Sequence, residues 1–102
     1  MNIQEMMKQA QKLKSKIQKI QDEIGEKTVE GSAGGGMVVV TANGKNQIIA
    51  VKIEKQVVNP EDVEMLQDLV VAATNQALTR AQEMMQTEVG KVTQGFNVPG
   101  IF

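Results

Sequence analysis

GGGMVVVTANGKNQIIAVKI, residues 34–53, is the stretch of sequence that decides the fold. Two runs rich in β-branched residues stand on either side of Asn43-Gly44, a pair that favours a two-residue hairpin because both central positions of a type I′ turn need positive φ. The three glycines predict a turn or bulge between strands, and Thr28-Val29-Glu30 before them is a candidate strand. We therefore predict a three-stranded antiparallel meander sheet within residues 26–56.

Residues 1–25 are predicted to form a first long helix, since residues 2–24 contain no Gly or Pro. Gly25 stands where a C′ glycine ends a helix. The apolar residues of this stretch recur with the heptad period of a coiled-coil seam, and they are Ile3, Met6, Ala10, Leu13, Ile17, Ile20 and Ile24. A helix of this length is about 35 Å long, too long for so small a chain to cover alone, so we expect a partner helix.

A second helix is predicted over residues 59–90, followed by a tail over residues 91–102 without a hydrophobic period. Asn59 is a typical N-cap, Pro60 suits the first helical position, and acidic residues follow in the first turn. Several apolar positions of this helix are alanine, which indicates a closely packed neighbour. The chain is therefore predicted to be one α+β domain, residues 1–102, with the order α-β-β-β-α.

The composition excludes most catalytic and metal-binding chemistry, because the chain contains no His, Cys, Tyr or Trp. Thiol and imidazole catalysis, the usual zinc sites and disulfides are thereby excluded. Glu61, Asp62, Glu64 and Asp68 could form an oxygen-ligand site, but carboxylates at a helix start explain them better. No Lys-Ser/Thr pair follows the glycines, so a phosphate-binding loop is disfavoured. We expect no enzyme activity, no cofactor or metal and no small-molecule substrate.

The apolar runs of the chain are short. The longest, Leu69-Val70-Val71-Ala72-Ala73, is far below the roughly 18 residues that a membrane span needs. The N-terminus mixes lysines with apolar residues and has no signal-peptide core. We therefore expect a cytoplasmic protein without a membrane partner.

Charge is distributed unevenly along the chain, although the formal net charge is only −1. Residues 1–24 carry five lysines against three acids, whereas residues 56–102 carry two basic groups against six acids. The acids at the predicted start of the second helix favour the positive end of the helix dipole. The basic first helix has no comparable local explanation.

Four lysines of the first helix, Lys8, Lys12, Lys16 and Lys19, form what we call the lysine ridge. At about 100° per residue they fall within an arc of about 80°, about 130° from the heptad seam, and span about 16 Å. Two interpretations are open: a solvated face that keeps the helix soluble, or a surface that contacts phosphates. Lysine suits phosphate contact without base selection. The helices and the hairpin offer no aromatic side chain to stack on unpaired bases, which favours duplex over single strands.

The chain resembles the YbaB/EbfC family of small bacterial nucleoid-associated proteins. The resemblance covers nearly the whole chain and is carried by an ordered set of motifs: Gly34-Gly35-Gly36-Met37-Val38-Val39-Val40, Asn43-Gly44, Glu64-Met65-Leu66-Gln67-Asp68-Leu69, Ala72-Ala73-Thr74-Asn75-Gln76-Ala77 and Pro99-Gly100. It implies an α-β(3)-α fold, an intertwined, tweezers-shaped homodimer, and binding of duplex DNA with little sequence preference.

From the ridge and the resemblance together we expect a cytoplasmic, nucleoid-associated homodimer that helps to organise the nucleoid and to regulate genes broadly. The expected DNA contacts are Lys8, Lys12, Lys14, Lys16 and Lys19. The expected dimer interface consists of Ile3, Met6, Ala10, Leu13, Ile17, Ile20, Leu66, Leu69, Ala73 and Ala77. With about four to six phosphates neutralised, the log–log salt slope of binding is expected near −4 to −5. The alternative is a coiled-coil protein-interaction module, such as a prefoldin-like holdase.

Overall fold

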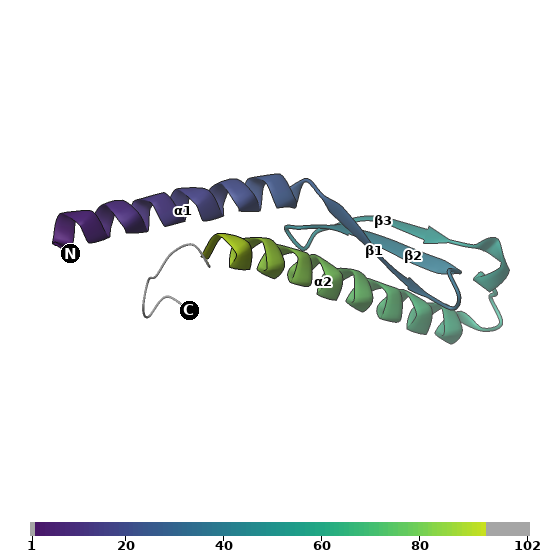
Figure 1. The fold of residues 1–102 in the computed structure, drawn as a ribbon. Coiled ribbons are helices and arrows are strands. Elements are labelled where there is room, and N and C mark those ends of the chain that lie inside the picture. The colour runs from purple at the N-terminus through teal and green to yellow at the C-terminus, as the bar shows by residue number, and fades with distance from the viewer. Residues whose placement is uncertain (1, 94–102) are drawn as a thin grey trace.

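The computed structural model describes residues 2–93 and has the order helix, three strands, helix. The elements are α1 (Ile3–Gly25), β1 (Thr28–Ala33), β2 (Val38–Asn43), β3 (Ile48–Ile53), a 3₁₀ turn η1 (Lys55–Val57) and α2 (Val63–Thr93). Figure 1 shows an elongated molecule in which α2 runs along the sheet and α1 continues away from it. The predicted α-β-β-β-α class is confirmed.

The sheet is the predicted antiparallel meander, with the strand order β1-β2-β3. Gly34, Gly35 and Gly36 connect β1 to β2, and all three have positive φ, between 65° and 91°. Residues with a Cβ adopt that conformation only at a cost. The glycines are thus a strand-connecting turn, as predicted.

The turn between β2 and β3 differs from the predicted two-residue type I′ turn. Four residues, 44–47, lie between the two strands, and the only non-glycine residue with positive φ within residues 2–93 is Asn46. The Asn46 N–H donates to the Asn43 carbonyl, and the Asn43 side-chain oxygen accepts from the N–H groups of Lys45 and Gln47. Gly44 is needed for space, because a Cβ there would overlap the backbone carbonyl of Ile24 at the end of α1. The turn therefore anchors α1 to the sheet.

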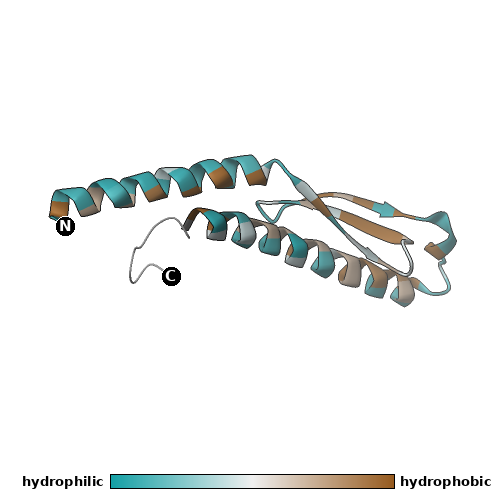
Figure 2. Ribbon diagram, in the orientation of Figure 1, coloured by the Kyte–Doolittle hydropathy of each residue, from teal (hydrophilic) through white to brown (hydrophobic). Residues whose placement is uncertain are grey.

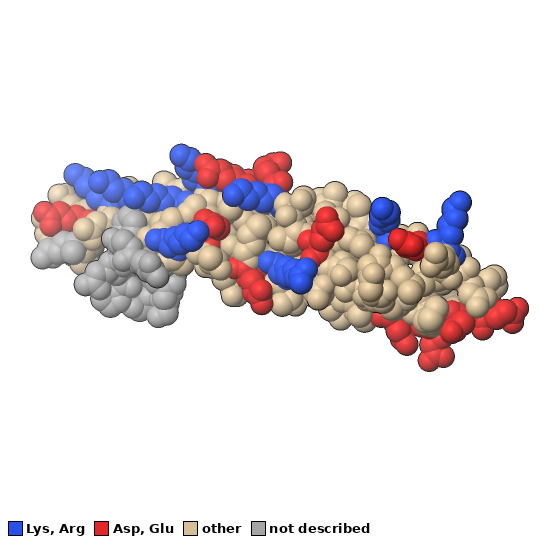
Figure 3. All heavy atoms as spheres, turned by 45° about the vertical axis from the view of Figure 1, so that its right-hand side comes forward, with Lys and Arg blue, Asp and Glu red and all other residues tan. Residues whose placement is uncertain are grey.

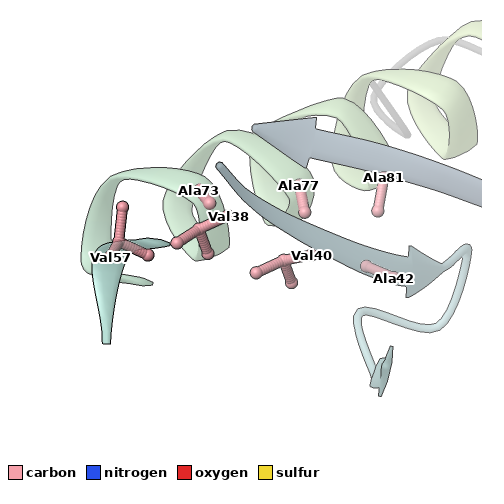
Figure 4. Close-up of a cluster of buried hydrophobic side chains, with 7 residues drawn as sticks. All are labelled: Val38, Val40, Ala42, Val57, Ala73, Ala77 and Ala81. Carbon is pink, nitrogen blue, oxygen red and sulfur yellow. The ribbon is translucent and has the colours of Figure 1, made fainter. Parts of the chain in front are cut away.

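The core lies between α2 and the first two strands. Figure 4 shows the buried residues of this cluster, which are Val38, Val40, Ala42, Val57, Ala73, Ala77 and Ala81. Three alanines one helical turn apart give α2 a flat face on which β1 and β2 can approach closely. Gly31 in β1 makes the approach closest, since a Cβ there would overlap backbone atoms of Ala73 and Ala77. The closely packed neighbour that the alanines of α2 predicted is therefore the chain's own sheet.

The C-cap of α1 and both ends of α2 differ from the sequence prediction. Gly25 is the last residue of α1 and the C-cap is Glu26, which has a right-handed conformation. Asn59 accepts from the N–H of Glu61 in a turn before α2, and Asp62 acts as the N-cap by accepting from the N–H of Met65. At the other end, α2 runs through Gly90 to Thr93, because one glycine inside a helix costs only about 1 kcal/mol.

Candidate nucleic-acid interface

The lysine ridge stands on the exposed surface of α1. Lys8, Lys12, Lys16 and Lys19 are all exposed, and at about 1.5 Å per residue they follow the helix axis over about 16 Å. Figure 3 shows lysine side chains side by side over the α1 end of the molecule. One DNA strand presents a phosphate about every 3.4 Å of axis, so a ridge of this length spans about five base-pair steps of a duplex.

Two glutamates bound the lysine ridge. Glu5 and Glu23 fall within about 30° of the middle of the ridge on the helical wheel. Glu23 lies 4.0 Å from the Lys19 ammonium, with the two side chains 62% and 77% exposed. An exposed pair at that distance contributes little, about 0–1 kcal/mol, so Lys19 remains accessible to a competing phosphate. Between Glu5 and Glu23, this face of α1 therefore carries lysines and no acidic residue.

Lys14 does not share the face of the lysine ridge. It lies about 155° around the helix from the middle of the ridge, although it is exposed. The five expected DNA contacts therefore do not form one surface. A duplex lying along the ridge would not meet Lys14.

The cations outside α1 are committed to other contacts or lie apart from the ridge. Arg80 donates from its guanidinium to the Glu30 carbonyl at 2.8 Å, and Lys91 pairs with Glu88 at 3.1 Å. The acids that precede and begin α2 lie at the opposite end of the molecule from the N-terminus of α1, as Figure 3 shows. The molecule is thus electrostatically polar along its long axis, which extends 69 Å.

The residues expected in the dimer interface have three different environments. Ala73 and Ala77 are fully buried against the chain's own sheet, and Leu13 is also buried within the protomer. These three are therefore not on the free surface: α2 uses its alanine face inside the chain, and Leu13 of α1 is buried at 3% exposure. Half-buried members are Ile17, Ile20, Leu66 and Leu69, and exposed members are Ile3, Met6 and Ala10.

Sequence reasoning assigned no interface residue to β3, yet every residue of this strand is exposed. Val51 and Ile53 are paired with Val40 and Val38, and directly paired residues project to the same face of a sheet. Val38 and Val40 are fully buried under α2, whereas Val51 and Ile53 are 46% and 38% exposed. The helix-side face of the sheet is therefore covered over β1 and β2 and bare over β3 (Figure 2). The four large apolar residues within 48–53 were the pattern that could have shown this.

The two edges of the sheet also differ. On the β1 edge, Gln76 accepts from the Ser32 N–H at 2.7 Å and Arg80 donates to the Glu30 carbonyl. Side chains of α2 thereby satisfy backbone groups that an edge strand would otherwise expose. No hydrogen bond of this kind reaches the outer edge of β3 in the part of the chain that the structure describes.

The described residues offer no obvious catalytic or metal centre. A hollow of about 330 Å³ lies where α1, the β2–β3 turn and α2 meet, and it is lined by Gln21, Asp22, Gly44, Lys45, Asn46 and Met85. It contains a single carboxylate, that of Asp22, and so lacks the pair that glycoside hydrolysis uses. Within residues 2–93 no three acidic residues are grouped so that they could hold a metal ion. No helix in this range is long and apolar enough to cross a membrane.

The architecture is shared with a solved structure. The crystal structure of an uncharacterized protein, HP0035, from Helicobacter pylori superposes with a TM-score of 0.78 over 89% of this chain and 96% of that one. The two sequences are 20% identical, so this similarity concerns the fold.

Comparisons of sequence identify the class. The profile of the YbaB/EbfC DNA-binding family matches residues 1–96. "Nucleoid-associated protein TTE0040" of Caldanaerobacter subterraneus subsp. tengcongensis is 52% identical over 101 residues, covering 99% of this chain and 91% of that protein. A "Nucleoid-associated protein" of Bacillus thuringiensis is 58% identical over 99 residues, covering 97% and 91%. The fold defines a small α+β protein of the order α-β-β-β-α with a lysine-rich first helix. The chain belongs to the YbaB/EbfC DNA-binding family, as its motifs indicated.

Proposed function

We propose that this protein is a nucleoid-associated protein that binds duplex DNA through phosphate contacts made by the lysine ridge. The observation that carries the proposal is the ridge itself: four exposed lysines on one face of α1, with no acid between Lys8 and Lys19 on that face. Family membership supports DNA as the partner. The relatives named nucleoid-associated proteins support a place at the nucleoid, and the proposal includes a cytoplasmic role in organising the nucleoid and in regulating genes broadly. The role is non-catalytic.

The chemistry of the ridge favours binding with little sequence preference. Phosphate contacts position a protein on DNA and carry no base information. The ridge has no Arg, Asn or aromatic side chain among its four members, and those residue types read or stack on bases. Duplexes of different sequence are therefore expected to bind with similar affinity.

A salt titration tests the electrostatic mechanism directly. Binding to a duplex of about 20 base pairs is measured between 50 and 200 mM salt, at a known protein concentration, and the slope of log K against log salt is expected near −4 to −5. A slope near zero would refute phosphate contact as the source of affinity. A second duplex of unrelated sequence, measured at the same salt, tests the lack of preference.

We also propose that the functional unit is a homodimer in which a second copy covers the bare face of β3. Val51 and Ile53 form an apolar strip on the helix-side face of β3. An exposed apolar surface is characteristic of a protein–protein interface. A second copy packed on this face of β3 would cover the strip.

The dimer has a matched pair of test variants on one strand. Val51→Asp places a charge on the helix-side face of β3, whereas Ala50→Asp places the same charge on the opposite face, because neighbouring strand residues alternate. Both positions are exposed in the protomer, so both variants should fold. Sedimentation is expected to show weakened dimers, by about tenfold or more, for Val51→Asp only, since a buried unpaired charge costs several kcal/mol. Equal effects of the two variants would contradict this interface.

One observation favours the alternative of a protein-interaction module. Ile3, Met6 and Met7, at the free end of α1, are exposed to 75%, 57% and 57%, and a holdase would present apolar residues at its helix tips. An aggregation-suppression assay beside a DNA gel shift separates the two functions. Suppression without retardation of DNA would favour the holdase.

A further inference from the structure

The heptad seam of α1 is covered over only part of its length. Towards the sheet, Leu13 and Ile24 are buried, and Ile17 and Ile20 are half-buried. Figure 2 shows the apolar residues of α1 on the side towards α2. Beyond Leu13, towards the N-terminus, the seam residues Ile3, Met6 and Ala10 are exposed. The apolar stripe therefore continues past the point where the described structure covers it.

The uncovered part of the seam lies beside and beyond the end of α2. α1 packs against α2, and in Figure 1 α1 runs on past the last described turn of α2, which ends at Thr93. The bare part of the seam, residues 3–10, is about 10 Å long. A segment that extends the α1–α2 contact would begin where α2 stops.

The nine residues that follow Thr93 in the sequence have the composition and the reach to do this. They read QGFNVPGIF and contain four large apolar residues, Phe96, Val98, Ile101 and Phe102. Nine residues reach at most about 30 Å, about three times the length of the bare stripe. Pro99, with Gly95 and Gly100, disfavours continuation of a regular helix. The segment therefore has the apolar content and the length to cover the bare part of the seam.

We infer that residues 94–102 dock along the N-terminal half of the α1 seam, on Ile3, Met6 and Ala10 of the same chain. Docking continues the α1–α2 contact and removes the exposed apolar stripe from water. The seam and the lysine ridge lie on different faces of α1, so the docked segment leaves the ridge open. The arm that carries the ridge is then held by the chain's own C-terminal segment. The inference does not depend on DNA binding.

The aromatic content of the chain makes this testable by methyl NMR. Phe96 and Phe102 are the only aromatic residues, and no His, Tyr or Trp is present. An aromatic ring shifts the resonance of a methyl group packed on its face, so any such shift on α1 has to come from residues 94–102. Methyl spectra of the full chain are compared with those of Phe96→Leu/Phe102→Leu, which keeps the apolar bulk and removes the rings.

The expected result is that the methyl resonances of Ile3 and Met6 move in the double variant, while those of Met37 and Met65 do not. The two control methionines are exposed and lie away from α1, and their unchanged resonances show that the variant is folded. Unchanged resonances of Ile3 and Met6 would overturn the inference. So would a shift confined to the methyl groups of β3.

A second measurement tests the loss of docking and its source. Phe96→Ser/Phe102→Ser is expected to lower the hydrogen-exchange protection of the α1 amides at 7–12 by about tenfold, because local opening sets the exchange of a helix end. Asn97→Ser is the matched control.

A mixing experiment tests whether the rings come from the same chain. A labelled Phe96→Leu/Phe102→Leu chain is mixed with unlabelled native chain. If the segment docks within one chain, the labelled chain keeps the resonances of the double variant in the mixture. If the labelled chain instead shows the native resonances, the rings come from the second copy, and the same-chain inference is overturned.

Discussion

Two variants, each with two lysines neutralised at a different end of the molecule, distinguish DNA contact by the lysine ridge from a general effect of net charge on DNA affinity. Lys8→Gln/Lys12→Gln removes half of the lysine ridge, and Lys52→Gln/Lys55→Gln removes the same charge from β3 and η1, away from α1. All four side chains are exposed, so neither change should disturb the core. The net charge of the two variants is identical, and any difference in DNA affinity then reports the position of the charge.

The magnitude follows from the number of phosphates that the ridge meets. With four to six contacts the slope is near −4.5, so raising salt from 50 to 200 mM lowers affinity by about 500-fold. Removing two of about five contacts lowers the slope to about −2.7, and the same change in salt then costs only about 40-fold. The Lys52/Lys55 variant is expected to keep the native slope.

Fluorescence anisotropy with a labelled duplex measures both slopes on the same salt series. Comparable slopes for the native chain and the Lys8/Lys12 variant would refute the assignment, however much the affinity at one salt concentration had changed. A slope lowered equally in both variants would show that the whole molecule acts as a diffuse cation. Lys14→Gln, on the other side of α1, provides a third reference and should leave the slope unchanged.

Two further predictions concern stability, measured by urea denaturation. Gly31→Ala is expected to destabilise the protein by about 3 kcal/mol, because the new Cβ would overlap the α2 backbone and push the helix away from the sheet. Gly35→Ala, which lies in open space but has positive φ, should cost only about 1–2 kcal/mol. A larger loss of stability for Gly35→Ala than for Gly31→Ala would contradict this packing. Asp62→Ala should lower the free energy of unfolding by about 1 kcal/mol through loss of the α2 N-cap, whereas Asn59→Ala should lower it by less. A larger loss of stability for Asn59→Ala would show that Asn59 is the N-cap, as the sequence predicted.

Much of the fold was predictable because local patterns and tertiary structure agree. The triple glycine at 34–36 connects strands, and the alanines of α2 lie where a close neighbour was expected. The β2–β3 turn was predicted in the right place but with the wrong type. What decided its conformation was the end of α1 packed on Gly44, a contact between residues about 20 positions apart that no local pattern contains.

The candidate site was predictable in part for a similar reason. Helix periodicity alone places Lys8, Lys12, Lys16 and Lys19 on one face. It does not say which apolar residues the chain covers itself, so Ala73 and Ala77 were expected at a dimer interface although their own sheet covers them. The bare face of β3 depends on where α2 crosses the sheet, which is set by the close approach at Gly31.

That close approach connects the core to the arrangement of the functional surfaces. Because Gly31 and the alanines of α2 draw the helix over β1 and β2, β3 is left bare on the helix side, and a second copy has an apolar strip to cover. The β2–β3 turn holds the end of α1 at the other end of the same sheet. Pairing through β3 would therefore bring two copies together at their sheets while each α1 extends away with its lysine ridge exposed. Dimer formation and DNA contact would then use different parts of the molecule, and a change at Val51 should weaken DNA binding only by removing the second ridge.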